Sequence, residues 1–307
     1  MNHHSSAVYN SNMRFARRSL LVGGIGLLSG CASSPVVSGT PQPVNSPTPV
    51  PQSPLLRDAA AALAAFKAEI SPEAGPPAWR DAALNQCDAQ LSRLCAADPL
   101  TGGPQLFEPP AATSSVGLQS AAKTSSETLR GLAAKAPSQA ERLLLASIAA
   151  AVLSASNPQL PPVPGQAAPG PLPKLSLPEA IQVAVTRIWS LIHGLEVGLG
   201  RLDDKPLAAA GTARLATALA QRDTWLAELT ELPDREIAYE LPTPMTTARE
   251  IRLGWASLEQ QLLNAQARIA AADDQHPQPR IAAMVASVAA VQRLGGRLPY
   301  WPGWATD

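Results

Sequence analysis

Residues 176–202 read SLPEAIQVAVTRIWSLIHGLEVGLGRL, and this stretch decides the fold. It opens on Ser176 with Glu179 three positions later, the capping-box pattern in which the two side chains satisfy backbone N–H groups at a helix start. Apolar residues then recur at spacings that alternate between four and three: Ile181, Val185, Ile188, Ile192, Leu195, Leu199 and Leu202. This stripe predicts a long helix that packs lengthwise against antiparallel neighbours.

The rest of the C-terminal half follows the same design. A second helix is expected over about 206–231, with an apolar stripe at Leu215, Leu219, Leu226 and Leu229. Prolines at 233, 242 and 244 exclude helix from 232–245. Thr247 and Glu250 form another capping box at the start of a third helix. A fourth helix covers about 280–294.

The N-terminal half shows four helices in the same order, near 55–70, 78–97, 113–136 and 138–156. In both halves the connection between the second and third helices is the long one. The 14 residues of 232–245 can extend to about 46 Å, enough to cross a helix about 39 Å long. We therefore expect an all-α protein made of two tandem ferritin-like four-helix bundles, each with a long crossover between helices 2 and 3.

Two proline-rich stretches set the expected domain boundaries. Such stretches are extended and do not pack well, so the second one is expected to make no fixed contacts and residues 176–307 to fold alone. The expected organisation is a signal peptide at 1–30, a Pro-rich tether at 31–54, bundle 1 at 55–156, a Pro-rich linker at 157–175 and bundle 2 at 176–307.

Composition agrees with helices and excludes one class of partner. Of the 307 residues 46% are hydrophobic but only 4% are aromatic, which suits an Ala/Leu helical core better than a β-sandwich. Basic and acidic residues number 24 each. Because no basic excess is present to neutralise phosphates, we do not expect a nucleic-acid partner.

The first residues predict export and a lipid anchor. Arg17 and Arg18 precede a short apolar stretch in 20–28, which is too short to span a bilayer as a helix. The paired arginines are typical of twin-arginine translocation, and they also fit the n-region of the general export route. The following Leu28-Ser29-Gly30-Cys31 resembles a lipobox, which implies that Cys31 is acylated after cleavage before it.

Cleavage before Cys31 leaves a mature chain with 21 basic and 24 acidic side chains. The chain therefore offers no polybasic patch for anionic headgroups, and attachment depends on the lipid. We expect an exported protein anchored to the outer face of the cytoplasmic membrane through Cys31.

Several short motifs resemble a known family, the ferritin-like domain of unknown function in exported actinobacterial proteins. They are Arg222-Asp223, the run from Ala238 to Pro242, Leu258-Glu259, Pro302-Gly303 and, in the first half, the run from Leu145 to Ala150. The resemblance is strongest over 176–304. It implies a ferritin-like fold and carries no settled activity.

The metal ligands of ferritin-like enzymes are missing from the sequence. Those enzymes use a Glu from each of two helices and a Glu-x-x-His from each of the others, whereas this chain contains no Glu-x-x-His. His193 and His276 are the only histidines after the signal peptide, and His193 is expected on an outer helix face. We therefore expect no cofactor and no enzymatic activity.

The function expected from these features is a binding or scaffold module of the cell envelope, with another envelope protein as its partner. The alternative is an enzyme or metal-binding protein with a non-standard site between the bundles, built from Glu196, Glu259, Asp223 and His193.

One charged residue lies on an apolar stripe. Arg222 is three residues after Leu219 and four before Leu226. A buried guanidinium needs a partner, so we expect an ion pair with Glu259, or with Glu196 as the second choice. The alternative is that Arg222 turns to the flank and keeps its charge in water.

Two smaller features leave alternatives open. Cys87 and Cys95 are eight residues apart, about 12 Å on a continuous helix, which favours two buried free thiols. A disulfide requires the helix to end before Cys95. The aromatic tail 300–304 is expected to fold back onto a bundle end, the alternative being an exposed recognition element.

Overall fold

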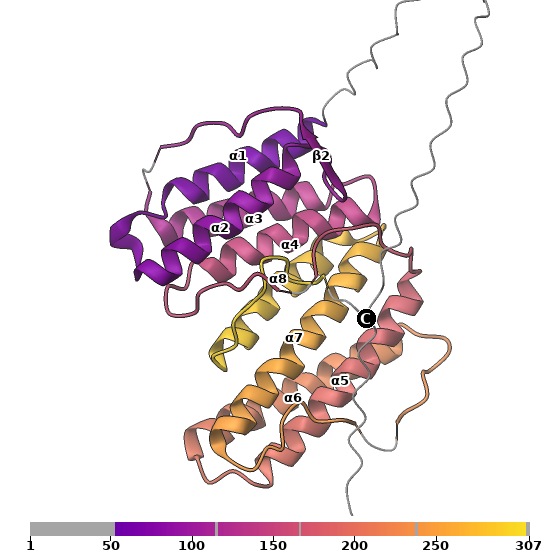
Figure 1. The fold of residues 1–307 in the computed structure, drawn as a ribbon. Coiled ribbons are helices and arrows are strands. Elements are labelled where there is room, and N and C mark those ends of the chain that lie inside the picture. The colour runs from indigo at the N-terminus through magenta and orange to yellow at the C-terminus, as the bar shows by residue number, and fades with distance from the viewer. Residues whose placement is uncertain (1–52, 114–115, 166, 237–238, 305–307) are drawn as a thin grey trace, which may run out of the picture. The chain divides into compact units, whose positions relative to one another are not determined.

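The computed structural model describes residues 53–304, except 114–115, 166 and 237–238. Within that part of the chain it contains eight α-helices, a single-turn helix and one two-stranded sheet, so the all-α class is confirmed (Figure 1). The predicted export residues Arg17 and Arg18 and the predicted lipidation site Cys31 lie outside the described residues.

The helices of the first half begin and end within three residues of the predicted positions, except that the third begins at Leu118 and not near 113. They are α1 (Pro54–Ala68), α2 (Pro77–Leu94), α3 (Leu118–Ala133) and α4 (Gln139–Ala155), with the single turn η1 (Pro72–Ala74) between α1 and α2. The stretch after α2 holds a short antiparallel pair, β1 (Ala96–Asp98) and β2 (Gly102–Gln105). Cys87 and Cys95 are buried free thiols, as expected.

The second half consists of α5 (Leu177–Leu199), α6 (Lys205–Ala227), α7 (Ala248–Ala272) and α8 (Pro277–Arg293). Both predicted capping boxes are present. The side chain of Ser176 accepts from the Glu179 backbone N–H, the side chain of Thr247 accepts from that of Glu250, and each glutamate bonds back to its N-cap backbone. These local bonds explain why α5 and α7 begin where the sequence places them.

Each half repeats one pattern of helix pairs. In the first half α1 packs against α2 and α3, and α3 against α4. In the second half α5 packs against α6 and α7, and α7 against α8. In neither half do the second and fourth helices pack along each other within the described chain. On this side of each half the two helices are joined near their ends. In the first half the indole N–H of Trp79 donates to the carbonyl of Ala155 at 2.9 Å, and in the second half Arg280 donates to Glu228 at 3.2 Å.

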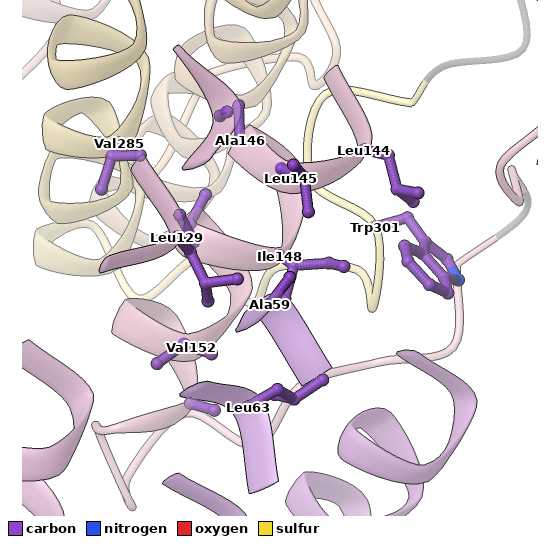
Figure 2. Packing of buried hydrophobic residues seen from close by; sticks show 14 of the residues in the cluster. Ala59, Leu63, Leu129, Leu144, Leu145, Ala146, Ile148, Val152, Val285 and Trp301 are labelled. Atoms are coloured by element: carbon purple, nitrogen blue, oxygen red, sulfur yellow. The ribbon is translucent and has the colours of Figure 1, made fainter. Parts of the chain in front are cut away.

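The hydrophobic core does not divide at the proline-rich stretch 157–175. One cluster combines α1–α4 with α8 and part of α7, and the other combines α5, α6 and the rest of α7. Figure 2 shows Val285 of α8 in the same cluster as Leu129 of α3 and Ile148 of α4. This packing differs from the expected pair of self-contained bundles.

The composition of α4 explains why the two halves share a core. Of its 17 residues 13 are buried, because the run 143–153 is apolar on every side of the helix. A helix that is hydrophobic all round must be covered all round. The stripe of α8 that ends in Val288 and Val291 supplies part of that cover, and buried Arg142 of α4 donates to the carbonyl of Ala271 near the end of α7 at 2.6 Å.

The C-terminal segment, residues 298–304, folds back onto the first half. The side chain of Gln90 in α2 donates to the carbonyl of Tyr300 at 2.7 Å. Trp301 and Trp304 are buried in the first cluster, and a Cβ on Gly303 would lie 3.4 Å from Leu143 of α4. The segment thus contacts both α2 and α4, the two helices that do not pack along each other.

The expectation that residues 157–175 make no fixed contacts is wrong. The backbone of Val163 donates to Leu298 at 3.0 Å and accepts from Tyr300 at 2.7 Å, forming a short parallel bridge with the C-terminal segment. The extended backbone that keeps this stretch out of a helix leaves its N–H and C=O groups available for such a bridge.

Candidate functional site

A cavity of about 580 Å³ lies where α6 and α8 face each other without packing. Helix α7 and the end of α5 contribute the remaining lining. The lining residues are Leu195, Leu207, Ala210, Gly211, Ala213, Arg214, Thr217, Gln221, Trp255, Glu259, Gln266, Ala283, Ala286, Ser287, Ala290, Arg293 and Leu294. The equivalent side of the first half is occupied by the C-terminal segment, whereas this one is an open recess.

Trp255 is held rigidly at one end of the cavity. Its indole N–H donates to the carbonyl of Gly194 at 2.8 Å, and the side chain is 1% exposed. Added Cβ atoms on Gly198 and Gly211 would lie 2.7 and 2.5 Å from the indole ring. Both glycines are therefore required by close approach of the ring, which brings α5 and α6 against α7 at this level.

A charged pair forms the centre of the cavity. The Nε of Arg214 donates to Oε1 of Glu259 at 2.6 Å, and Nη2 donates to Oε2 at 3.1 Å. The Glu259 side chain is 2% exposed and that of Arg214 is 20% exposed. This parallel two-bond geometry is the strongest form of an arginine–carboxylate contact, and it compensates a carboxylate that is otherwise costly to bury.

A second polar layer lies seven residues further toward the C-terminal ends of α6 and α7. Gln221 follows Arg214 by seven residues, and Gln266 follows Glu259 by seven, a rise of about 10 Å on each helix. Oε1 of Gln266 accepts a hydrogen bond from the hydroxyl of Ser287 on α8. We call Gln221, Gln266 and Ser287 the amide layer, and Arg214, Glu259 and Arg293 the charged layer.

Arg293 belongs to the charged layer because α8 runs antiparallel to α7. Ser287 contacts Gln266, and a Cβ on Gly296 would lie 3.2 Å from Ala256. Arg293, six residues after Ser287, is therefore about 9 Å along α8 from the amide layer, at the level of Glu259. Its Nε donates to the Ala289 carbonyl of its own helix, and it makes no ion pair with any described residue.

An ion-pair cluster ties α6 to α8 beyond the amide layer. Arg280 near the start of α8 donates through Nη1 to Glu228, the C-cap of α6, at 3.2 Å and through Nε to Asp273 at 3.1 Å. Burial acts to raise the pKa of Asp273, but hydrogen bonds from the His276 backbone and from Arg280 outweigh it and lower that pKa. The ion pair between Arg280 and Glu228 thus holds α6 and α8 together at the end of the cavity nearest the amide layer.

The sequence prediction named the wrong arginine. Arg222 donates to its neighbour Asp223 at 2.7 and 2.9 Å on the flank of α6. The partner of buried Glu259 is Arg214, two turns earlier. Glu196, the second choice, is exposed. The prediction followed the leucine stripe of α6, whose members are only partly buried.

The stripe that faces inward instead begins with one leucine and continues with small, polar and aromatic residues. Leu207, Gly211, Arg214, Ala218, Gln221 and Trp225 are spaced four, three, four, three and four apart. Four of them are the buried residues of α6, and the other two are Arg214 and Gln221, which line the cavity. This alternation was the signal in the sequence that could have located Arg214.

The alternative site built from Glu196, Glu259, Asp223 and His193 is not assembled. Glu259 is bonded to Arg214, Asp223 to Arg222, and the ring of His193 lies beside that of Tyr239 with centroids 6.0 Å apart. Across the described residues, no group of three or more His, Cys, Asp or Glu side chains is placed to hold a metal ion.

Comparisons with protein-family models, with curated proteins and with solved structures found no match to this chain. Among the described helices, none combines the length and the apolar character that crossing a membrane requires.

Proposed function

We propose that this protein is a lipid-anchored binding module of the cell envelope that holds a ligand in the cavity between α6 and α8. The proposal rests on the cavity itself, which has mostly apolar walls and a buried ion pair at its centre. A volume of about 580 Å³ with a few fixed polar groups is typical of small-molecule sites.

We further propose that both halves are ferritin-like bundles without a di-metal site. The pairing of helices 1 with 2, 1 with 3 and 3 with 4 in each half supports this, as does the long connection between α6 and α7. In the second half the Arg214–Glu259 pair takes the centre of the bundle, where a ferritin-like enzyme would place carboxylates around metal.

The lipid anchor remains a proposal from the sequence of residues 1–54. Cys31→Ala should abolish acylation and processing, so that the protein migrates as a larger precursor or is recovered in the soluble fraction. A variant that stays membrane-bound at the normal mature size would contradict the anchor. A Cys87→Ala variant is the matched control and should be processed normally.

The binding function is tested by identifying a small molecule that co-purifies with the protein. Full-length protein from its native host, extracted in mild detergent, should release a small molecule that mass spectrometry detects in stoichiometric amount. Ala286→Leu places a larger side chain in the cavity and should remove that molecule, whereas Ala289→Leu, on an exposed face of the same helix outside the cavity, should retain it.

Two outcomes would overturn the proposal. One is wild-type protein that carries no small molecule, and the other is equal recovery from the Ala286→Leu variant. Stoichiometric iron, manganese or zinc in the same preparation would instead support the alternative, an enzyme or metal-binding protein.

A further inference from the structure

We propose that the ligand of the α6–α8 cavity is a single-chain monocarboxylate, an amphiphile with one anionic head and an apolar body. This inference rests on the proposed function and adds the chemical class of the ligand. Three features of the lining carry it: its net charge, the availability of one arginine, and the apolar surface on either side of the charged layer.

The cavity has one positive charge in excess. Its charged lining residues are Arg214, Glu259 and Arg293. Glu259 is neutralised by Arg214, which leaves the charge of Arg293 without a counter-ion among the described residues. A single uncompensated cation matches a monoanion, and it disfavours a cationic ligand or a metal ion.

The remaining hydrogen-bond donors of the charged layer suit a carboxylate. Arg214 donates to Glu259 through Nε and Nη2, and neither bond uses Nη1. Arg293 uses only Nε, on the Ala289 carbonyl of its own helix, so both of its terminal amino groups remain for a ligand. Guanidinium groups bind carboxylates through such paired, charge-assisted bonds.

The rest of the lining suits an apolar body. Two small residues, Thr217 on α6 and Ala290 on α8, lie along the stretch of about 10 Å that separates the charged layer from the amide layer. The hydroxyl donor of Thr217 is already used on the Ala213 carbonyl of its own helix. Ala213 adjoins the charged layer, and Ala286 the amide layer, just outside this stretch. Beyond the charged layer on the other side, Trp255 closes the cavity together with leucines of α5 and α6. An alkyl chain removes such surface from water on binding.

Calorimetry with defined probes tests this assignment. Full-length Cys31→Ala protein, which lacks the lipid, is titrated with decanoate, decanol and decyltrimethylammonium below their micellar concentrations. One decanoate should bind per chain, because its carboxylate pairs with Arg293. Decanol should bind at least about tenfold more weakly than decanoate, and decyltrimethylammonium should not bind.

Variants then place the carboxylate. Arg293→Gln should weaken decanoate about tenfold and leave decanol unchanged, since only the charged contact is lost. Arg293→Lys should recover most of the decanoate affinity. Arg249→Gln removes an exposed arginine of α7 outside the cavity and should have no effect. Because the Arg293 side chain is exposed, the Arg293→Gln variant should unfold at the same temperature as the wild-type protein, which checks that the variant is folded.

The inference is overturned if decanol binds as tightly as decanoate, if none of the three probes binds, or if Arg293→Gln leaves decanoate affinity unchanged. It is also overturned, while the binding function stands, if the molecule recovered from native protein is neutral or cationic. Failure of the binding function is a different result, in which native protein carries no molecule at all.

Discussion

Arg214 and Glu259 are 45 positions apart and join α6 to α7 through two parallel hydrogen bonds, of 2.6 and 3.1 Å, inside the second half of the protein. The glutamate is almost completely inaccessible, whereas the arginine reaches the cavity. The pair thus neutralises a buried carboxylate within the candidate binding site, and it leaves Arg293 as the residue that sets the net charge of the lining.

Removing one member of this pair should be costly. Arg214→Ala leaves Glu259 buried without its partner, and we expect a loss of about 3 kcal/mol in unfolding free energy, the lower end for a buried pair because the arginine is one-fifth exposed. Arg214→Leu combined with Glu259→Leu should recover much of this loss. Chemical denaturation of the single and double variants measures the coupling.

Arg222 provides the matched control on the same helix. Its partner Asp223 is exposed, so Arg222→Ala should change the unfolding free energy by less than about 1 kcal/mol. Equal losses for Arg214→Ala and Arg222→Ala would mean that the Glu259 pair contributes no more than a surface contact.

Gly211 should not tolerate alanine. An added Cβ would lie 2.5 Å from the Trp255 ring, so Gly211→Ala should destabilise the protein by about 1–3 kcal/mol through overpacking. Gly131, inside α3, has nothing within 4 Å of an added Cβ. Gly131→Ala should therefore stabilise the protein by about 0.5–1 kcal/mol. Thermal unfolding distinguishes the two, and the same sign for both would contradict the packing around Trp255.

The C-terminal segment should stabilise the first half of the chain. Trp301 is 5% exposed and belongs to the cluster that contains Leu144 of α4, as Figure 2 shows. Trp301→Ala should cost about 3–5 kcal/mol through lost burial and the cavity left behind. Leu253, 47% exposed on α7, is a suitable control, and its change to Ala should cost under about 0.5 kcal/mol. Hydrogen exchange should show the loss of protection from Trp301→Ala in α2 and α4.

Acid should weaken the bonds that join the end of α7 to the start of α8. The folded-state pKa of Asp273 lies below its ordinary value of 3.8, so this carboxylate contributes stability above that value and loses it as the pH falls through the lower folded pKa. Asp273→Asn should therefore flatten the fall in unfolding free energy below about pH 4. Asp203→Asn, at an exposed position, should leave the profile unchanged.

The buried thiols should be inert in the folded protein. Burial raises the pKa of Cys87 to about 12 and also raises that of Cys95, so neither forms much thiolate at mildly alkaline pH. Iodoacetamide should leave both unmodified in native protein and label both in denaturant, as judged by the mass of the alkylated chain. Rapid labelling of native Cys87 would show that the α2 packing opens readily.

The sequence by itself determined the helices of this protein closely, but it did not indicate the short β1–β2 pair that follows α2. The capping boxes at Ser176 and Thr247 and the proline-rich connections located the helix boundaries, because caps and prolines act on backbone groups a few residues away. The burial of Glu259 could also be anticipated, since it adjoins the apolar stripe of its helix. The lipid anchor at Cys31 is a prediction on residues outside those described.

Only the tertiary structure decided which helix faces meet. Leucines marked one stripe of α6, yet the stripe that turns inward carries Gly211 and Arg214, because the indole of Trp255 needs space that only a glycine leaves. Likewise α8 covers α4, whose surface is apolar on every side, and so it leaves α6 unpacked and the cavity open. Periodicity defines a helix locally, but burial is non-directional, and the choice among apolar surfaces depends on every neighbour at once.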